Sequence, residues 1–590
     1  MMASLKDMQF VIHDVFDAAS LYRRLTGDDS MDRAFINSLL DEAHRFTEGV
    51  IRPCNRVGDE VGCRLTDGVV TTPPGFREAY RGFIDGGWAG LLGPVEYGGQ
   101  ALPATFGLML EELMCTANMA FSMYPGLSRG CVHALMTHGS DDQKSMFLPK
   151  LLTGEWTGTM CLTEPQAGSD VGLARTRAVA RADGTWSITG TKIFISAGEH
   201  DLSDNIIHLV LARTEGSPAG TRGISMFAVP KFDLDGTRNG VVCSAIENKM
   251  GIHGNATCVL MFDAARGYLV GAEQQGMKYM FTMMNSARIG VGLQGVSLAQ
   301  AGFELSSAYA HERLQMRSLS GPKAPDKPAD PIVVHPDVRR MLLSQRAFIE
   351  GGRALAYFAS QCVDTLLLAK DPESIRRAQD LLDFLTPVVK GFLTEGGFAS
   401  VNDAVQIFGG AGFIRESGVE QLVRDSRITM IYEGTTQIQG LDLLARKVLM
   451  TQGKGLNRLL PELVEVAAQC QAEFPEMAAR LSSIAEEWPA ISMQIGGKAM
   501  QNPDEVGAAA VDYLFYSGYA MLAWLWARMA VCASDGVLAG GDTDYLAGKI
   551  DLARFYYARI LPRLNAHRDS MLAGGDSLMK VHASVLMANR

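Results

Sequence analysis

The spacing of apolar residues changes twice along this chain, and the order of these changes restricts the folds that it can adopt. From about residue 30 to 158 the apolar positions recur every three or four residues, as in "DRAFINSLLDEAHRFTEGVI", which predicts helices. Between 159 and about 270 they form short alternating runs such as "WSITGTKIFIS", which predict the strands of a small antiparallel sheet or barrel. Helical spacing then resumes, so we expect an α+β fold that is mostly helical.

Two breaks divide the second helical region. The stretch "SLSGPKAPDKPADPIVVHP" is rich in proline and charge and predicts a loop, and "MTQGKG" marks a break near residue 450. We therefore predict four domains: an N-terminal helical domain with a short extension, a middle β domain, a C-terminal helical bundle, and an additional C-terminal helical domain. Their predicted bounds are 1–158, 159–275, 276–450 and 451–590.

The longest uncharged apolar stretch, "YLFYSGYAMLAWLWA" at 513–527, lies in the last of these domains. It is shorter than the roughly 18 residues that suggest a membrane span, so it predicts a buried helix and no transmembrane segment. Because it is too apolar to face water, we expect it to pack against the preceding bundle.

Charge and cysteine usage narrow the classes of function. The formal net charge of -11 argues against broad nucleic-acid binding, although a local basic pocket for a phosphorylated ligand is compatible with it. The 10 cysteines are scattered singly, without the spacing of a zinc site, and no metal is expected. The N-terminus has no uninterrupted apolar segment of the kind found in signal peptides. These features favour a reduced, cytoplasmic protein.

The segment "RITMIYEGTTQIQG", at 427–440, places Glu433 between an apolar strip and a run of small polar residues. On its own it is compatible with a helix start in which Glu433 lies in the first turn and complements the helix dipole. A second segment, "MCLTEPQAGSDVGLARTRA" at 160–178, contains a turn that can present backbone N–H groups to a phosphate or a flavin edge. An ordinary loop would explain that segment equally well.

Five segments together resemble the acyl-CoA dehydrogenase family. "CLTEPQAGSD", "GTKIFIS", "AYAHERLQ", "AVQIFGGAGF" and "MIYEGTTQIQ" have the order and approximate spacing of the family's signature segments, over roughly residues 40–450. The helical domain after 450 is similar to that of the large bacterial branch, which includes enzymes for fatty acyl-CoAs and for 3-methylmercaptopropionyl-CoA. The resemblance implies α,β-dehydrogenation of an acyl-CoA to a trans-2-enoyl-CoA in fatty acid β-oxidation, with FAD as cofactor and an electron-transfer flavoprotein as electron acceptor.

The resemblance also implies roles for individual residues. Glu433 would be the catalytic base, since a thioester α-proton is weakly acidic and its removal needs a base in a water-poor site. The residues implied in substrate binding are Ser169, Arg288, Tyr432 and Gly434. Those implied in FAD binding are Leu162, Thr163, Gly168, Ser169, Phe194, Ser196, Arg313, Gln315, Gln406, Gly410, Thr435 and Gln437. The family's counterparts of Arg313 and of Gln406 to Gly410 reach the FAD of a neighbouring subunit, so a shared FAD site is expected. A homodimer is favoured over the tetramer common among shorter members of the family, because the added C-terminal domain could cover the surface that a second dimer would use.

The sequence departs from the family pattern at several of these positions. Phe194 stands where Trp is usual and Ser196 where Thr is usual, and both keep the required aromatic face or hydroxyl. On strand alternation alone, Phe194 would be a core aromatic residue. Met316 and Arg317 replace the familiar Phe-Gly, and an apparent one-residue insertion leaves the role of Arg446 open.

Some features carry alternative readings. Arg288 could be an ordinary charge on a helix surface, and Gly409-Gly410 could simply end a helix. His253 and His311 have no companion acids or cysteines, so they are interpreted as structural. An acyl-CoA oxidase would share most of the segments and is an alternative enzyme. A noncatalytic scaffold that binds flavin or acyl-CoA is the alternative that is not an enzyme. Acyl chain length is not readable from the sequence.

Overall fold

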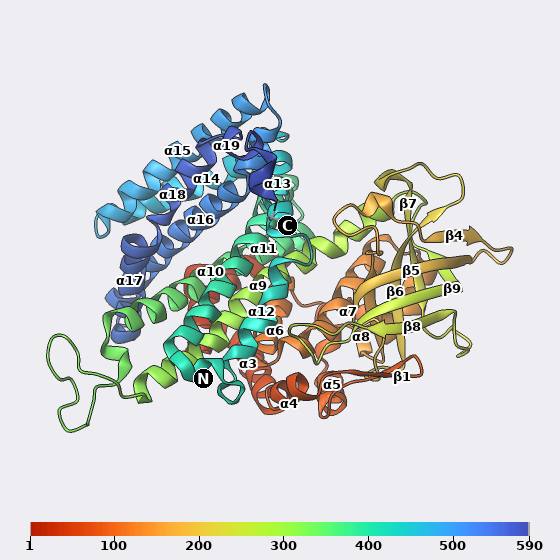
Figure 1. Ribbon diagram of the computed structural model, residues 1–590, viewed down its shortest axis with the longest axis horizontal. Helices are drawn as coiled ribbons and strands as arrows, with labels where there is room; N and C mark the ends of the chain where they lie inside the picture. The colour runs from red at the N-terminus through yellow and green to blue at the C-terminus, as the bar shows by residue number, and fades with distance from the viewer. Residues whose placement is uncertain (1, 588–590) are drawn as a thin grey trace. The chain divides into compact units, whose positions relative to one another are not determined.

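The computed structural model describes residues 2–587, and the chain divides into two compact units. The first unit contains residues 1–41 and 291–590, and the second contains residues 42–290. Helices predominate, and strands are concentrated in the second unit, so the predicted α+β fold with a mostly helical composition is confirmed (Figure 1). Helices α3 (Arg33–Phe46) and α9 (Gly276–Glu312) contribute residues to both units.

The second unit combines a group of helices with a β domain. Its helices are α4 (Cys54–Val61), α5 (Phe76–Asp85), α6 (Ala104–Ala117), α7 (Met119–His138) and α8 (Asp141–Thr153). Helix α8 begins with a capping box, in which the Ser140 hydroxyl accepts from the backbone N–H of Gln143 and the Gln143 side chain accepts from the N–H of Ser140. Helices α6 and α7 are apolar on most sides because they lie in the interior.

The β domain is a seven-stranded sheet that closes on itself through the pairing of β6 with β7. Its strands are β3 (Trp156–Cys161), β4 (Arg177–Ala180), β5 (Trp186–Ser196), β6 (Asn205–Thr214), β7 (Ile224–Pro230), β8 (Val241–Ile246) and β9 (Thr257–Leu269). Strand β6 pairs in parallel with β3 and β4, and the other pairings are antiparallel. Nearly every β6 residue is buried, as expected of a central strand.

A short hairpin lies within the region for which the sequence predicts only helices. Strands β1 (Arg64–Thr66) and β2 (Val69–Thr71) pair through a two-residue turn at Asp67 and Gly68, with φ of 50° and 77°. Both angles lie in the left-handed region that this kind of tight turn requires, which Asp-Gly adopts readily. The Asp-Gly dipeptide was therefore the available signal for this hairpin.

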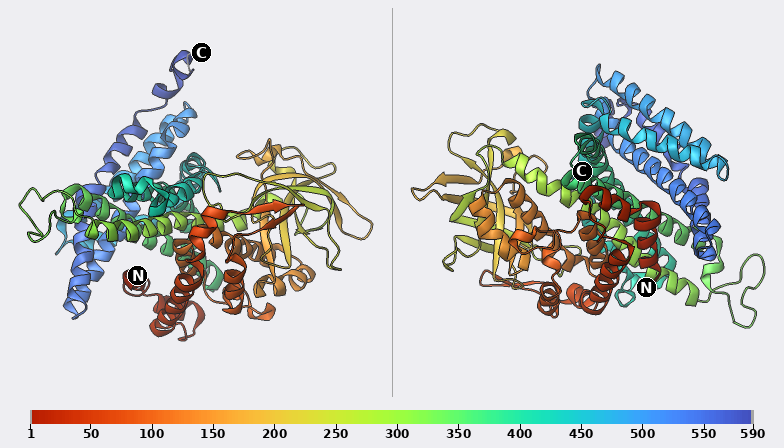
Figure 2. Two further views of the ribbon diagram at one scale, coloured as in Figure 1. Left: turned by 60° about the horizontal axis from the view of Figure 1, so that its bottom comes forward. Right: turned by 180° about the vertical axis from the view of Figure 1, so that it is seen from behind.

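The helices of the first unit pack around α10 (Pro336–Leu368) and α11 (Pro372–Phe408). The others are α1 (Met2–Gln9), α2 (Ala18–Thr26), α12 (Val419–Ser426), α13 (Thr436–Leu441), α14 (Lys454–Cys470), α15 (Pro475–Ala499), α16 (Asp504–Leu538), α17 (Thr543–Phe555), α18 (Arg563–Leu572) and α19 (Asp576–Met579). In Figure 2 the C-terminal helices, in blue, lie beside the green helices of the bundle.

The stretch 513–527 lies inside α16, a helix of 35 residues. Among the described residues, α16 is long and apolar enough to cross a membrane by length and composition. The run at 513–527 was expected to be too short for this, but the helix extends well beyond it on both sides. Its apolar centre is buried in the structure, however, as in the core helix of a globular protein. The indole N–H of Trp526 donates to the carbonyl of Ala347 in α10 at 3.0 Å, and the Trp524 ring contacts Phe358 of the same helix. The predicted packing against the bundle is confirmed.

A buried cluster of charges joins α1, α10 and α17 within the first unit. The Lys549 ammonium donates to Asp7 at 2.5 Å and also to Glu350, and Arg346 donates to Glu350 at 2.7 Å and to Asp7 at 3.2 Å. Burial alone would raise the pKa of Asp7, but Lys549 and Arg346 outweigh it and hold that pKa below its usual value. The N-terminal helix is thus fixed to a helix more than 500 residues away, since Asp7 and Lys549 are 542 positions apart.

Candidate active site

Glu433 lies in a strained turn between a 3-10 helix, Arg427–Met430, and helix α13. Helix α13 begins at Thr436, and the hydroxyl of Thr435 caps it by accepting from the N–H of Ile438. Glu433 therefore precedes the cap, and its reading as a first-turn residue of a helix is wrong. Its φ of 55° is followed by a φ of 90° at Gly434, so two successive residues have left-handed backbone. Such strain in a non-glycine residue is concentrated at functional sites.

The predicted neighbours of Glu433 share this turn. Tyr432, Gly434 and Thr435 are half-buried, and Gln437 is exposed on the first turn of α13. The Tyr432 hydroxyl donates to the side-chain oxygen of Gln294. One carboxylate oxygen of Glu433, Oε2, is buried from solvent. A carboxylate on a sharp turn, with one oxygen shielded, is suited to act as a general base.

Four predicted FAD residues of the first unit form a separate, exposed group. Arg313 and Gln315 follow the end of α9, and Gln406 and Gly410 lie at the end of α11. The Tyr309 and Phe408 rings stack at 4.2 Å and bring these two helix ends together. Gly409 ends α11 with φ 62°, so the glycine pair does terminate the helix, and a side chain at Gly410 would meet open space.

This exposed group is distant from Glu433 within the chain. Lys390 of α11 contacts the Glu433 turn through the carbonyl of Gly434. Gln406 lies 16 residues further along the same helix, which corresponds to about 24 Å at the rise of an α-helix. The structure therefore does not bring Arg313, Gln315, Gln406 and Gly410 to Glu433 in one unit of a single chain.

The proline-rich segment after Gln315 is an ordered loop closed by Asp330. The carboxylate of Asp330 is buried and accepts from the backbone N–H groups of Ser318, Lys323 and Ala324 at 2.7 to 2.9 Å, and from Arg317 at 3.2 Å. The hydrogen bond from Ser318, with those from Ala324 and Lys323, lowers the pKa of Asp330 to about 2. Arg317, which departs from the family pattern, is thus part of the loop's own structure.

In the second unit, a buried ion pair fixes the loop that contains Leu162 and Thr163. Lys192 of β5 donates to Glu164 at 2.8 Å and to the carbonyl of Leu162 at 2.9 Å, and neither charged side chain is more than 3% exposed. Glu164 also accepts from the N–H groups of Arg175 and Thr176. Burial would raise the pKa of Glu164, but Lys192 and these hydrogen bonds reverse the effect and lower it to about 2.

The loop held by this pair presents the other predicted residues of its segment. The carbonyl of Thr163 accepts from the N–H of Ile193 at 2.9 Å, and Glu164 and Ala167 exchange both backbone hydrogen bonds across a tight turn. Gly168 and Ser169 follow on the exposed side, where a Cβ at Gly168 would meet nothing. The turn is therefore open to a ligand at Gly168 and Ser169, and it is fixed to β5 by the Lys192–Glu164 ion pair.

A bulge in β5 turns Phe194 outward. Lys192 pairs with Leu260 and Ile195 with Cys258, so the register shifts between them. An uninterrupted strand would place Phe194 on the buried face with Lys192, but Phe194 has φ 59° and is 59% exposed. The reading of Phe194 as a core aromatic residue is wrong because the bulge re-aims its side chain. Ser196 pairs with Thr257 and is half-buried.

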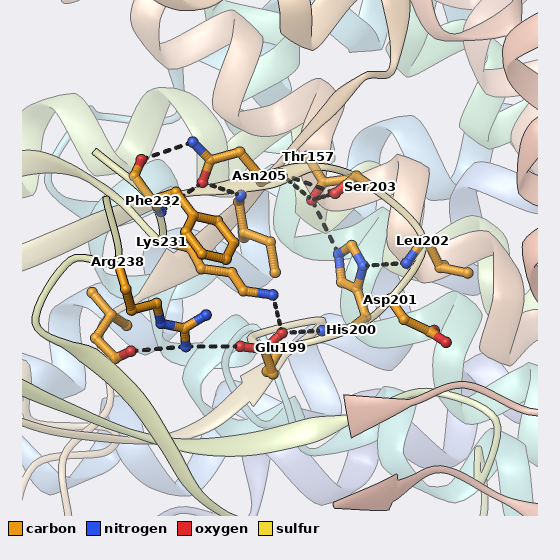
Figure 3. A network of polar contacts seen from close by, with 12 residues as sticks. Thr157, Glu199, His200, Asp201, Leu202, Ser203, Asn205, Lys231, Phe232 and Arg238 are labelled. Carbon is orange, nitrogen blue, oxygen red and sulfur yellow. Dashed lines mark hydrogen bonds and ion pairs between the residues drawn. The ribbon is translucent and has the colours of Figure 1, made fainter. Parts of the chain in front are cut away.

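A second buried network holds the chain just after Ser196 (Figure 3). Glu199, only 3% exposed, accepts from Lys231, from Arg238 at 3.3 Å and from the N–H of His200 at 3.1 Å. The His200 ring lies between the hydroxyl of Thr157 and the N–H of Leu202, and burial lowers the pKa of His200 to about 3. The segment of Phe194 and Ser196 is thus anchored at both ends by buried ion pairs.

The remaining predicted positions have simpler surroundings. Arg288 is 6% exposed and lies 5.9 Å from the Phe281 ring centroid, so its reading as a surface charge is wrong. His253 contacts the backbone carbonyls of Asp59 and Lys249, and His311 contacts the carbonyl of Ser307. The Asp59 carboxylate also lies 3.0 Å from Nδ1 of His253, so the expectation that His253 has no companion acid is wrong. Arg446 is 68% exposed and pairs with Asp442 at 3.6 Å.

Sequence reasoning missed four residues that position the site. They are Glu164, Lys192, Lys390 and Gln439. The available signal was a lone lysine within an apolar run, as in "TKIFIS" and "TPVVKGFLT", since a charge in a buried segment requires a partner. The identity of each partner was not readable.

Four family models match the chain in succession. They are acyl-CoA dehydrogenase, N-terminal domain at residues 37–155, middle domain at 159–265 and C-terminal domain at 274–449, followed by the acetyl-CoA dehydrogenase C-terminal-like model at 462–582. FAD is the cofactor of this family. Together the four matches include the domain after residue 450.

Relatives and solved structures agree over the full length. The chain is 41% identical to 3-methylmercaptopropionyl-CoA dehydrogenase of Ruegeria pomeroyi, over 98% of this chain and 99% of the relative. It is 34% identical to the broad-specificity linear acyl-CoA dehydrogenase FadE5 of Mycobacterium tuberculosis, over 92% and 93%. The fold matches an acyl-CoA dehydrogenase of Bacillus anthracis complexed with FAD, with a TM-score of 0.73 at 21% identity over 96% and 92% of the two chains. This chain therefore belongs to the acyl-CoA dehydrogenase family of oxidoreductases, in a branch that has an additional C-terminal helical domain.

Proposed function

We propose that this protein converts a linear acyl-CoA thioester to the trans-2-enoyl-CoA, with Glu433 as the base that removes the α-proton. The observation that carries the proposal is the position of Glu433, on a left-handed turn outside the helix and with one oxygen shielded from solvent. Bound FAD supplies the acceptor for the β-hydrogen, as hydride. A cytoplasmic role in fatty acid β-oxidation, with an electron-transfer flavoprotein as electron acceptor, completes the proposal.

The residues of the second unit fit a flavin. An exposed aromatic ring at Phe194 can cover a flat face, and the open turn at Gly168 and Ser169 can approach a ligand closely. The N–H groups of Leu162 and Thr163 and the Thr163 hydroxyl would serve the polar edge of the ring, because both carbonyls already accept from protein donors. Ser196 would add a hydroxyl.

The names of the full-length relatives favour a linear acyl group. One relative is named for 3-methylmercaptopropionyl-CoA, and another is named a broad-specificity linear acyl-CoA dehydrogenase. Tyr432 and Gly434 would line the acyl site, and Ser169 and Arg288 would contact the CoA. We infer a preference for short linear chains, including a thioether chain of similar length.

Anaerobic bleaching of the flavin by a panel of acyl-CoAs tests the function. Butyryl-CoA, 3-methylmercaptopropionyl-CoA and octanoyl-CoA are compared with the branched isobutyryl-CoA, and product is identified by mass spectrometry. We expect rapid bleaching by the short linear substrates and at least ~10-fold slower bleaching by isobutyryl-CoA. A flavin that no acyl-CoA bleaches would support the scaffold reading, and rapid peroxide formation in air would support an oxidase.

We further propose a homodimer that shares its FAD sites. Lys390, whose ammonium contacts the Glu433 turn, lies about 24 Å along α11 from Gln406. This separation supports the proposal, since Arg313, Gln406 and Gly410 could then serve the FAD of the second subunit. Arg313→Ala should weaken FAD binding by about 1.5 to 3 kcal/mol, roughly 10- to 150-fold, through loss of a charged hydrogen bond.

Light scattering combined with flavin absorbance measures this prediction. Arg376→Ala is the matched control, because Arg376 is 63% exposed and pairs with Glu373 on the same helix. We expect flavin content to follow dimer content in wild type and to fall in Arg313→Ala alone. A stable monomer with one FAD per chain would rule out the shared site.

A further inference from the structure

The backbone of the Glu433 turn is held from two sides by buried polar side chains. The Gln439 amide donates to the carbonyl of Glu433 at 2.9 Å, and the Lys390 ammonium donates to the carbonyl of Gly434 at 2.6 Å. Both side chains have 0% exposure. Two consecutive peptide carbonyls are thus fixed by side chains from different helices, α13 and α11.

This fixation matters because the turn is not a conformation that the sequence adopts by itself. A left-handed conformation costs a non-glycine residue about 1–2 kcal/mol, and it persists only where its surroundings impose it. At Gly434, a Cβ would come within 2.7 Å of the Gln439 amide nitrogen, so the close approach of Gln439 requires glycine there as well as a positive φ. The hydrogen bonds and the glycine therefore act together.

Other polar contacts near the turn involve the side chains of Tyr432 and Thr436 and leave the backbone of Glu433 and Gly434 untouched. The Thr436 hydroxyl donates to Glu395 at 2.6 Å, and the Tyr432 hydroxyl donates to Gln294. These contacts hold side chains on either side of Glu433 and Gly434. The hydrogen bonds of Lys390 and Gln439 fix the two carbonyls, and hence the direction of the Glu433 side chain and of the Gly434 N–H between them.

We propose that Lys390 and Gln439 are positioning residues that hold the Glu433–Gly434 backbone in its left-handed conformation and so direct the Glu433 carboxylate at the α-proton of the substrate. The inference rests on the proposed function of Glu433. A shift of about 1 Å in a catalytic group can reduce a rate by two orders of magnitude, so a relaxed turn would slow proton removal without removing the base.

The test measures proton removal separately from oxidation. A 3-thia-acyl-CoA has sulfur at the β position and no β-hydrogen, so it undergoes only loss and return of its α-proton. Glu433 would take the proton while the C–H electron pair passes into the thioester enolate, and return of deuterium from D₂O would label the α-carbon. Mass spectrometry of the CoA ester gives the exchange rate after subtraction of the rate without protein.

Gln439→Leu and Lys390→Met are compared in the FAD-loaded protein, with thermal stability and flavin content measured in parallel. Gln345→Leu is the matched control: Gln345 is another fully buried glutamine of the first unit, on α10, bonded to Ser306 and to the carbonyl of Met341. We expect a loss of exchange of at least 10-fold in Gln439→Leu and Lys390→Met, and wild-type exchange in Gln345→Leu.

The outcomes separate this inference from the proposed function. If Glu433→Gln keeps wild-type exchange, the assignment of the base fails. If Glu433→Gln abolishes exchange while Gln439→Leu exchanges as fast as Gln345→Leu, the base stands and the positioning role is overturned. Gln439→Leu removes no charge, and leucine is similar in volume to glutamine. This variant therefore tests the positioning role even if Lys390→Met does not fold.

Discussion

Glu433→Gln is expected to yield a folded, yellow protein whose flavin is not reduced by acyl-CoA. The substitution keeps the shape of the side chain and removes only the basic oxygen, so its effect falls on proton transfer. General-base contributions are typically 10²- to 10⁴-fold, and we expect the rate constant for flavin bleaching to fall by at least about 10³-fold. The Gln439 and Lys390 bonds to the backbone would remain, because they involve main-chain carbonyls.

Anaerobic stopped-flow absorbance at the flavin band measures this loss. Flavin content and melting temperature are recorded for the same preparation, and both should match wild type because the backbone of the turn is unchanged. Glu395→Gln is the matched control, since Glu395 lies near the turn and accepts from Thr436 without being the proposed base. Bleaching of Glu433→Gln at the wild-type rate would refute the assignment of the base.

Removal of the residues after Gly453 is expected to give an insoluble or flavin-poor protein. Helix α16 is in close contact with the bundle: a Cβ at Gly518 would come within 2.1 Å of the Phe392 ring, and one at Gly391 within 2.5 Å of Leu514. Trp524 and Trp526 are fully buried. Without α16, the apolar faces of α10 and α11 that these side chains cover would meet water, which favours aggregation.

Solubility, flavin absorbance and light scattering measure the effect of this truncation. A chain that ends at Ala573 is the control, because helix α19 and the 3-10 helix Ala583–Leu586, which it lacks, contain no buried residue. Trp526→Ala gives a milder version, with an expected loss of about 3–5 kcal/mol in the free energy of unfolding. A soluble and fully active chain that ends at Gly453 would show that the last domain is dispensable.

Several features of this protein were readable from local sequence. The change from helical to alternating spacing predicted the helices and the β domain, because periodicity reports which face of each element is buried. The segments around Thr163, Phe194 and Glu433 identified the family because their motifs are contiguous. The burial of α16 followed from its composition, although its length did not.

The site itself depended on contacts between distant parts of the chain. Lys390 and Gly434 are 44 positions apart, and Glu164 and Lys192 are 28 apart. Neither pair can be predicted from the spacing of residues along a short segment. The exposure of Phe194 follows from a register shift in β5, which strand alternation cannot predict.

Local spacing in the sequence determined the order of the helical and β domains, and the resemblance of contiguous motifs to a known family determined the candidate base, since both depend on neighbours a few positions away. Only the tertiary structure decided that Glu433 precedes its helix in a left-handed turn, and which buried side chains hold it there. The physical reason is that a strained backbone and a buried charge are stable only with partners from other elements, and packing chooses those partners.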